Sequence, residues 1–317
     1  PERFGVLLGV NVLAWDLAAM TRYLVESESV DHPGVLDMSR ANRYCMHQIN
    51  PLDFSLKTLP NLAAGHAAIA YNAQAICRAL TEGPVGGVHA VGQAYRFVAE
   101  GDLNVALCGG ADAPVEEMVF ATYAGSRFFG WEAEGEPGPI GGEGAGLLVL
   151  EAAEHARARG AVVRAEVLGF SATAGDGTPV PDADPDRLAE RIAATVNAVV
   201  EEAGTRPDVV SLHGDGGVVH DAAEARALAA VLGDAATRTA RVAMKPQHGD
   251  LGAGSGPVEL AACSMLLERA IIPPVAWQPP KQPSAPPRSA LLIALGFFGE
   301  CAALMLGRTS PEGERAA

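Results

Sequence analysis

Short apolar runs bounded by glycine are the feature that most limits what this chain can fold into. Several are continuous Val, Leu and Ala without polar alternation, as expected of strands that helices cover on both faces. Segments with apolar residues at helical spacing lie between them. Alternating strands and helices predict an α/β protein with sheets inside and helices outside. The predicted strands lie at 4–10, 103–108, 146–150, 163–170, 209–213, 290–295 and 302–306.

Three helices have clear signals at their ends. Asp184 followed by Pro185 is an N-cap with proline at the first helical position, and Gly204 suits the C-cap of the same helix. Gly101 ends a second helix, and Pro257 opens a third. These signals support the alternation of strands and helices along the whole chain.

The strands and helices fall into two sets. We therefore expect two related α/β halves, residues 1–160 and 161–308, followed by a polar tail at 309–317. Segments 131–141, rich in Gly and Glu, and 273–288, rich in Pro, are predicted to be surface loops.

Charge, cysteine content and hydropathy exclude several classes of protein. The 317 residues carry a formal net charge of −15, which argues against nucleic acid and anionic membranes as partners. Five scattered cysteines without a C-x-x-C pair argue against disulfide frameworks and structural zinc, and favour a reduced, cytoplasmic protein. No apolar run approaches the roughly 18 residues of a membrane span, and no signal-peptide pattern is visible.

Two clusters invite a binding interpretation. The glycine-rich segment 249–256 runs into a helix, where its N–H groups could cradle an anion, but close packing of the helix start against a sheet is favoured. His213, Asp215 and His220 form a set that could bind a metal, yet no further strong ligand is nearby. We expect neither a metal nor a cofactor.

Seven motifs stand in a fixed order along nearly the whole chain. They are 61–66, 87–96, 101–113, 142–146, His213-Gly214 with Asp221 and Glu224, Lys245 with Gly249 and Glu259, and Gly296-Phe297. Together they resemble the β-ketoacyl-ACP synthases of the thiolase fold. The resemblance implies two related halves in a layered α-β-α-β-α sandwich. It also implies that the first strand and several helices of the family are absent here, which leaves a sheet edge exposed or covered by a partner.

The resemblance implies a degenerate catalytic site. Members of the family carry an acyl thioester on a cysteine at a helix N-terminus, and two histidines assist decarboxylation of malonyl-ACP. The nucleophile position here holds Pro84, which has neither a nucleophile nor an N–H. The first histidine is His213, although Asp215 replaces the usual Thr, and the second histidine is replaced by Asp250.

Of two other parts of the family's site, the closing loop is changed in this sequence and a supporting ion pair is retained. The closing loop carries Phe298 and Glu300 after Phe297, in place of residues that let this loop swing. A supporting ion pair is kept as Lys245 and Glu259.

An intact scaffold around a lost nucleophile is similar to the chain-length factors of type II polyketide synthases. The resemblance then implies a subunit inactive by itself that pairs with an active ketosynthase, shapes the acyl tunnel and sets the length of the polyketide. Its partners would be that ketosynthase, the growing chain and, through the ketosynthase, acyl carrier protein. Pro84 replaces the usual Gln of aromatic pathways and favours a divergent, polyene-type branch.

The resemblance also places the interface. The segment 50–60 lies near the partner's acyl pocket, and the strand before Pro84 pairs across the pseudo-twofold axis. Candidates for lining the tunnel or the interface are Leu56, Leu59 and Tyr71.

Two rival functions stay open at this stage. The chain could be a condensing or acyl-transfer enzyme that uses Cys77 or Cys301 with His213 as base. Of the two, Cys77 is expected to be buried ahead of the nucleophile turn, and Cys301 to lie nearer the site. Alternatively, the chain only stabilises its partner.

Overall fold

The fold is described from a computed structural model of the chain. It describes residues 1–11, 17–48, 59–115, 119, 121–122, 126, 128, 139–237, 239–271 and 285–309.

The first sheet has four strands in the order β2-β1-β3-β4. The first three are parallel, and β4 runs antiparallel to β3. The strands are β1 (Phe4–Val10), β2 (Cys77–Leu80), β3 (Val105–Asp112) and β4 (Gly144–Glu151).

The second sheet has five strands in the order β5-β9-β8-β6-β7. Its strands β6, β7 and β8 are parallel, whereas β9 is antiparallel to both β8 and β5. The strands are β5 (Glu166–Thr173), β6 (Val209–Ser211), β7 (Ala240–Val242), β8 (Ser289–Leu295) and β9 (Cys301–Gly307).

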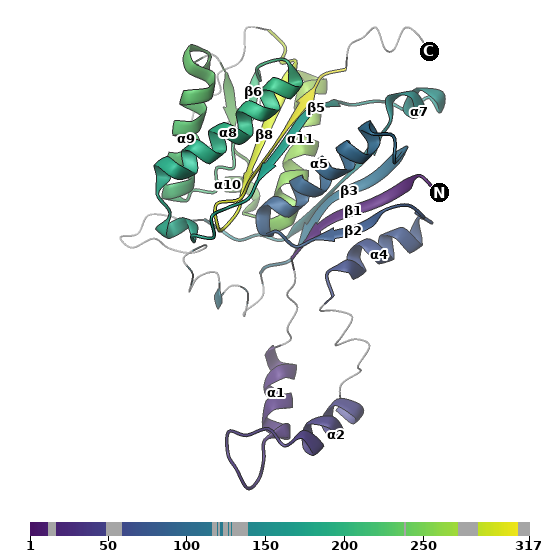
Figure 1. Ribbon diagram of the computed structural model, residues 1–317, viewed down its shortest axis with the longest axis vertical. Helices are drawn as coiled ribbons and strands as arrows, with labels where there is room; N and C mark the ends of the chain where they lie inside the picture. Colours follow the sequence, from purple (N-terminus) through teal and green to yellow (C-terminus); the bar gives the residue numbers. More distant parts are fainter. Residues whose placement is uncertain are drawn as a thin grey trace.

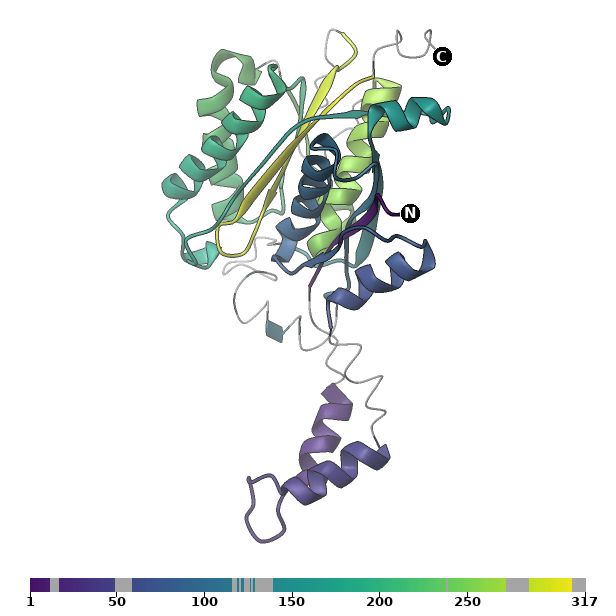
Figure 2. The same ribbon diagram turned by 45° about the vertical axis from the view of Figure 1, so that its right-hand side comes forward.

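Helices form three layers around the two sheets (Figures 1 and 2). Helix α4 (Asn61–Ala70) covers the outer face of the first sheet, and α5 (Gly86–Ala99) and α11 (Ser255–Arg269) lie between the sheets. Helices α8 (Pro185–Ala203) and α9 (Val218–Leu232) cover the second sheet from outside. This α-β-α-β-α arrangement confirms the predicted fold class.

The remaining elements are short or lie at the periphery. Helices α1 and α2 pack on each other and project away from the sheets in both views. These elements are α1 (Leu17–Ser27), α2 (Met38–Gln48), α7 (Ala153–Ala158) and α10 (Lys245–His248), with the 3₁₀ turns η1 (Gly83–Val85), η2 (Val180–Asp182), η3 (Gly233–Thr237) and η4 (Gly252–Gly254).

The middle layer is packed without room for side chains at its glycines. A β-carbon on Gly87 of α5 would lie 1.9 Å from the Ala253 carbonyl oxygen of η4, and one on Gly256 would lie 2.1 Å from Val88 Cγ2. Such distances exclude any side chain unless the backbone moves. The glycine cluster at 249–256 therefore serves close packing, as predicted.

The two halves repeat one order of elements. The series β1-α4-β2-α5-β3-β4 matches β6-α9-β7-α11-β8-β9, and each half builds a sheet from it. The second sheet adds β5 beside β9, whereas no strand of the described residues pairs with the outer edge of β4. Leu147 and Val149 of β4 are 51% and 62% exposed. Both β2 and β4 are therefore edge strands of the first sheet within the described residues, and the expected loss of the family's first strand stays a prediction.

The predicted strands form, with boundaries shifted by up to four residues, but two strands were missed. Strands β2 and β7 have only four and three residues, each at the end of its sheet, and each contains an arginine that breaks the apolar pattern. The division at residues 160 and 161 stays a prediction. Residues 131–138 and 273–284 of the predicted loops, and 310–317 of the tail, lie outside the described residues.

Candidate functional site

Pro84 lies in the 3₁₀ turn that leads directly into α5, and its side chain is buried. The turn begins with Gly83 at φ +60°, a conformation that glycine adopts without strain. The Gly83 N–H donates to Oδ1 of Asn11 at 3.0 Å. Because proline has no N–H, the first turn of this helix offers one donor fewer at the position where the nucleophile was expected.

His213 follows β6 and is 1% exposed. Its Nδ1 accepts a hydrogen bond from the Leu295 N–H at 3.2 Å, so the neutral ring carries its proton on Nε2. Nε2 lies 3.3 Å from Oδ2 of Asp215. Burial, followed by the nearby Lys245 cation, lowers the pKa of His213 to about 4, so the ring is neutral at pH 7.

Lys245 and Glu259 form a buried ion pair beneath the histidine. Nζ lies 3.0 Å from Glu259 Oε1 and donates to the His213 carbonyl oxygen at 2.9 Å. Both side chains are at most 3% exposed. The pair thus fixes the backbone that presents His213.

Asp250 does not face open space. Its Oδ1 accepts from the Gly252 N–H at 2.9 Å and from the Ser255 hydroxyl at 2.9 Å. The residue is 2% exposed and pairs with Gly141 in an isolated β-bridge. The carboxylate therefore holds the 3₁₀ turn η4 against the first residue of α11.

The loop after β8, residues 296–300, closes over the same region. The Phe297 ring stacks on Phe128 at 4.4 Å between centroids and lies near Gly83, where an added β-carbon would be 3.8 Å from it. The Phe297 carbonyl accepts from the Val180 N–H at 2.9 Å, and the Phe298 N–H donates to Glu300 at 3.0 Å. These contacts hold the loop against Phe128 and Val180.

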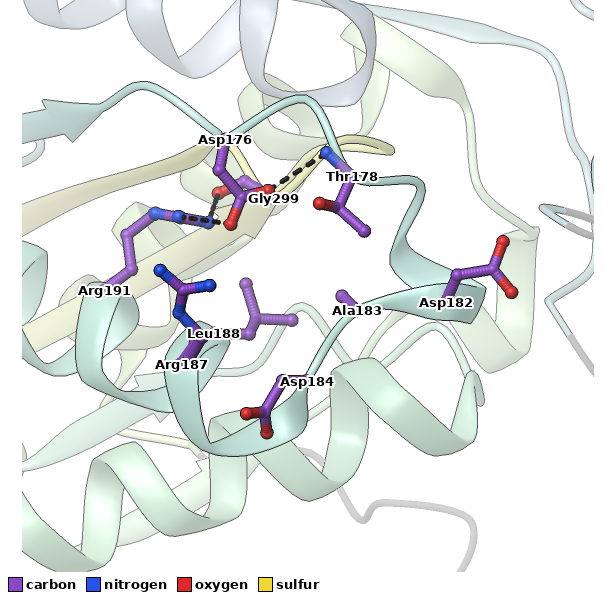
Figure 3. Close-up of a pocket in the computed structure, with 9 residues that line it drawn as sticks. All are labelled: Asp176, Thr178, Asp182, Ala183, Asp184, Arg187, Leu188, Arg191 and Gly299. Carbon is purple, nitrogen blue, oxygen red and sulfur yellow. Dashed lines mark hydrogen bonds and ion pairs between the residues drawn. The ribbon is translucent and has the colours of Figure 1, made fainter.

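A pocket of about 210 Å³ borders this loop on its outer side (Figure 3). Arg191 of α8 donates to the Gly299 carbonyl at 3.1 Å and pairs with Asp176 at 3.0 Å. Asp176 also accepts from the Thr178 N–H at 3.0 Å. The guanidinium therefore ties the loop to α8 and to the segment that contains Asp176. The lining residues are Asp176, Thr178, Asp182, Ala183, Asp184, Arg187, Leu188, Arg191 and Gly299.

Comparison with known proteins identifies the scaffold. Residues 2–156 match the beta-ketoacyl synthase N-terminal domain, and residues 164–277 match the beta-ketoacyl synthase C-terminal domain. The chain belongs to the beta-ketoacyl synthase family. No helix among the described residues has the length and apolarity to cross a membrane.

Two proteins similar to this chain are named for polyketide or ketosynthase functions. A Streptomyces halstedii protein named as a polyketide beta-ketoacyl synthase 1 is 30% identical over 282 residues, which are 80% of this chain and 65% of that protein. The structure of the ishigamide ketosynthase/chain length factor is similar with a TM-score of 0.75 and 26% identity, over 98% of this chain and 76% of the solved one.

A third similarity supports the fold alone. A type II PKS acyl-carrier protein in complex with its ketosynthase bound to the hexaketide matches with a TM-score of 0.75 and 22% identity, over 98% of this chain and 79% of the solved chain. The chain thus has a ketosynthase-like fold, and it spans about two thirds of the length of the first curated relative.

The expected site residues converge except for the tunnel candidates. Leu56 lies outside the described residues. Leu59 and Tyr71 flank the two ends of α4 and are 47% and 65% exposed, so they belong to the surface of this chain. Their role at a tunnel or an interface stays a prediction.

The structure corrects the expectation for Cys77 and weakens Cys301 as a candidate nucleophile. Cys77 was expected to be buried, but it is exposed, because β2 is an edge strand. Cys301 is buried at the start of β9, and burial raises the pKa of its thiol to about 12. A thiol that holds its proton so tightly is a poor nucleophile.

The structure brings together His213, Asp215 and His220, the set that the sequence offered as a possible metal site. His220 Nδ1 lies 2.8 Å from Asp215 Oδ2, and one ligand atom from each of these two residues and His213 fall within 4.8 Å of one another. A metal on Nε2 of His213 would need the ring proton on Nδ1, where the Leu295 N–H already donates. The hydrogen bonding thus favours a metal-free chain of polar contacts.

Proposed function

We propose that this chain is a non-catalytic ketosynthase-like subunit that pairs with an active β-ketoacyl-ACP synthase and shapes its acyl tunnel, setting polyketide chain length. The carrying observation is Pro84, buried in the turn that leads into α5, at the position where the resemblance leads us to expect the family's nucleophile. A ring nitrogen without hydrogen can neither hold an acyl group nor donate to an oxyanion. We assign the subunit to a polyene-type pathway.

The state of the remaining groups supports this function. The Asp250 carboxylate already accepts hydrogen bonds from the Gly252 N–H and the Ser255 hydroxyl. The Phe297 ring lies beside the turn that contains Pro84. By contrast, the Lys245–Glu259 pair that braces the backbone is complete. The ion pair that supports the fold is therefore present, whereas the nucleophile and the second histidine that condensation would need are not.

An open sheet edge supports pairing with a second chain. Strand β2 is bonded only to β1 within the described residues, and both Cys77 and Arg78 on it are exposed. A free edge of this kind is a template for a strand of another chain. Leu59 and Tyr71, exposed at the two ends of α4, would then meet the partner or the growing chain.

The proposed function is tested by measuring whether either subunit gains the mass of an acyl group. The chain is co-expressed with its ketosynthase, acyl and malonyl carrier proteins are added, and the intact mass of each subunit is measured. An acyl adduct on the partner alone, with this chain unmodified and co-purifying, is the expected result. The Cys301→Ser variant is the matched control and leaves the pattern unchanged. An adduct on this chain that disappears in Cys301→Ser would establish the relocated-cysteine enzyme instead.

The tunnel is tested by product length. Leu59→Trp and Tyr71→Ala change bulk at the two ends of α4 and are expected to shift the number of extensions by at least one. Val162→Trp, also at an exposed apolar residue but outside the helix, is the control. If both α4 variants give the wild-type product, the chain only stabilises its partner.

A further inference from the structure

We propose that the outer edge and the outer face of β4 form a docking site for a strand and an amphipathic helix of another polypeptide chain. The inference goes beyond the proposed function and does not depend on it. The proposed function assigns the β2 edge to the ketosynthase, and β2 and β4 lie at opposite edges of the first sheet. The repeat within this chain indicates which kind of segment fits β4.

Strands β4 and β9 occupy equivalent places in the two halves. Each pairs antiparallel with the strand before it, β3 or β8. Ala106, the second residue of β3, pairs with Leu150. Ala290, the second residue of β8, pairs with Leu306. Leu306 belongs to the hydrophobic cluster of the middle layer, and Leu150 packs against the same cluster. The register and the inward faces of β4 and β9 therefore agree.

The outward faces of the two strands differ in what covers them. On β9, the outward side chains are those of Cys301, Ala303 and Met305, which are at most 1% exposed because they share a hydrophobic cluster with residues of α8. On the equivalent face of β4, Leu147 is 51% exposed and Val149 is 62% exposed. Both faces are apolar, so β4 has the composition of a covered strand, but nothing among the described residues covers it.

Two elements cover β9 in the second half. Strand β5 pairs antiparallel with its edge, and α8 packs on the outer face of both strands. Figure 1 shows α8 and α9 outside the second sheet and α4 outside the first. Helix α8 turns one buried apolar stripe toward the strands, which includes Leu188, Ile192 and Val196. A segment that fits β4 therefore has an apolar strand, antiparallel to β4, followed by a helix with such a stripe.

The size of such a segment suits a stable interface. Strand β4 has eight residues and is thus about 26 Å long, which a helix of about 18 residues matches. Strand β5 has eight residues and α8 has 19. A segment of this size lies within the roughly 20–30 residues per side of a standard interface. Backbone hydrogen bonds to the edge give affinity, and the apolar face gives specificity.

A second copy of this chain does not fill the same site. Two β4 strands paired antiparallel in one sheet are related by a twofold axis perpendicular to that sheet. Both outer faces then point the same way, and Leu147 and Val149 of each copy stay uncovered. A segment that brings its own helix covers the edge and the face together.

The test uses the chain's own strand–helix unit as the probe. A fluorescently labelled peptide of residues 166–203 is titrated with the intact 317-residue chain, and anisotropy gives the dissociation constant. The control peptide carries Ile192→Asp and Val196→Asp, which interrupt the apolar stripe of the helix. We expect the unmodified peptide to bind at least tenfold more tightly than the control peptide. Equal binding of the two peptides would overturn the proposal.

Variants of the chain test the site itself. Leu147→Lys/Val149→Lys is expected to weaken binding of the unmodified peptide at least tenfold. Val162→Lys is the matched control, because Val162 is apolar and 76% exposed but lies outside β4, and it should leave the dissociation constant unchanged. Unchanged binding to the β4 variant, or no saturable binding up to about 1 mM peptide, contradicts the inference.

Hydrogen exchange locates the bound peptide. With saturating peptide, the amides of β4 should exchange more slowly, and those of β5 and β9 should be unaffected. Faster exchange in β5 without protection of β4 would show that the peptide has replaced the chain's own unit on β9, and the inference would then be wrong. Each contrary result leaves the proposed function standing, because that function depends on the mass and product-length results.

Discussion

Glu224 is a buried carboxyl whose proton links stability to pH. It lies on α9, and its Oε1 accepts from the His213 N–H at 2.8 Å. Burial raises its pKa from 4.5 to about 8. The folded protein thus keeps a proton that the unfolded chain releases above about pH 4.5. This contribution to stability is complete at low pH and is lost as the pH rises toward 8.

We expect Glu224→Gln to flatten this dependence. Between about pH 5 and pH 8, the free energy of unfolding of the wild type should fall relative to that of the variant, by up to about 1.4 kcal/mol per pH unit. Urea denaturation at each pH measures it. Glu190→Gln, at an exposed glutamate of α8, is the control and should follow the wild type. Parallel curves for Glu224→Gln and the wild type would show that Glu224 titrates alike in both states.

Helix α5 tolerates no side chain where it meets the turn before α11. A β-carbon on Gly87 would lie 1.9 Å from the Ala253 carbonyl oxygen, so Gly87→Ala is expected to destabilise the protein by about 3 kcal/mol. Gly65 of α4 has no atom within 4 Å of such a carbon, and Gly65→Ala should stabilise by about 1 kcal/mol. Denaturant unfolding compares the two. Equal effects would contradict the close contact of α5 with η4.

Strand β4 is the element most exposed to unwanted pairing. Its outer edge is unpaired among the described residues, and Leu147 and Val149 expose apolar side chains on one face of the strand. Charges on such an edge oppose strand addition. Leu147→Lys/Val149→Lys is expected to lower self-association at least fivefold in sedimentation velocity. Val162→Lys, at an apolar residue 76% exposed away from β4, should have no effect. The same effect from Val162→Lys would mean that net charge alone is responsible.

At the scale of the whole molecule, sequence patterns predict the interior far better than the edges. Strands buried on both faces, such as β8, need continuous apolar residues, so they can be recognised from the sequence. Strands β2 and β7 are short and lie at the ends of their sheets. They form because they hydrogen-bond to a neighbouring strand, and their amino-acid composition does not reveal them. Cys77 is exposed because β2 has a neighbouring strand on one side only within the described residues.

The candidate site shows the same division. Motif order places Pro84 and Asp250, because spacing along the chain is enough to align them. The contact of Asp215 with His213 depends on a loop between β6 and α9 and on a proton direction fixed by Leu295 of another strand. No local pattern contains that information, since the two segments lie about eighty residues apart in sequence.

The two halves are expected to unfold together, because their interface is a core. One hydrophobic cluster joins Val88 of α5 with Leu304 of β9. Glu202 of α8 adds a polar link, accepting from Arg96 of α5 at 2.7 Å and from the Phe170 N–H of β5 at 3.1 Å. A shared core of this kind couples the sheets into one cooperative unit.

Calorimetry tests this coupling. Wild-type protein should show a single transition with equal calorimetric and van't Hoff enthalpies. Because the Glu202 side chain is 26% exposed, Glu202→Gln is expected to cost only about 1 kcal/mol and to lower the midpoint of the whole transition. Glu201→Gln, at the adjacent exposed glutamate, is the matched control. Two transitions, of which Glu202→Gln moves only one, would show instead that the halves unfold as separate domains.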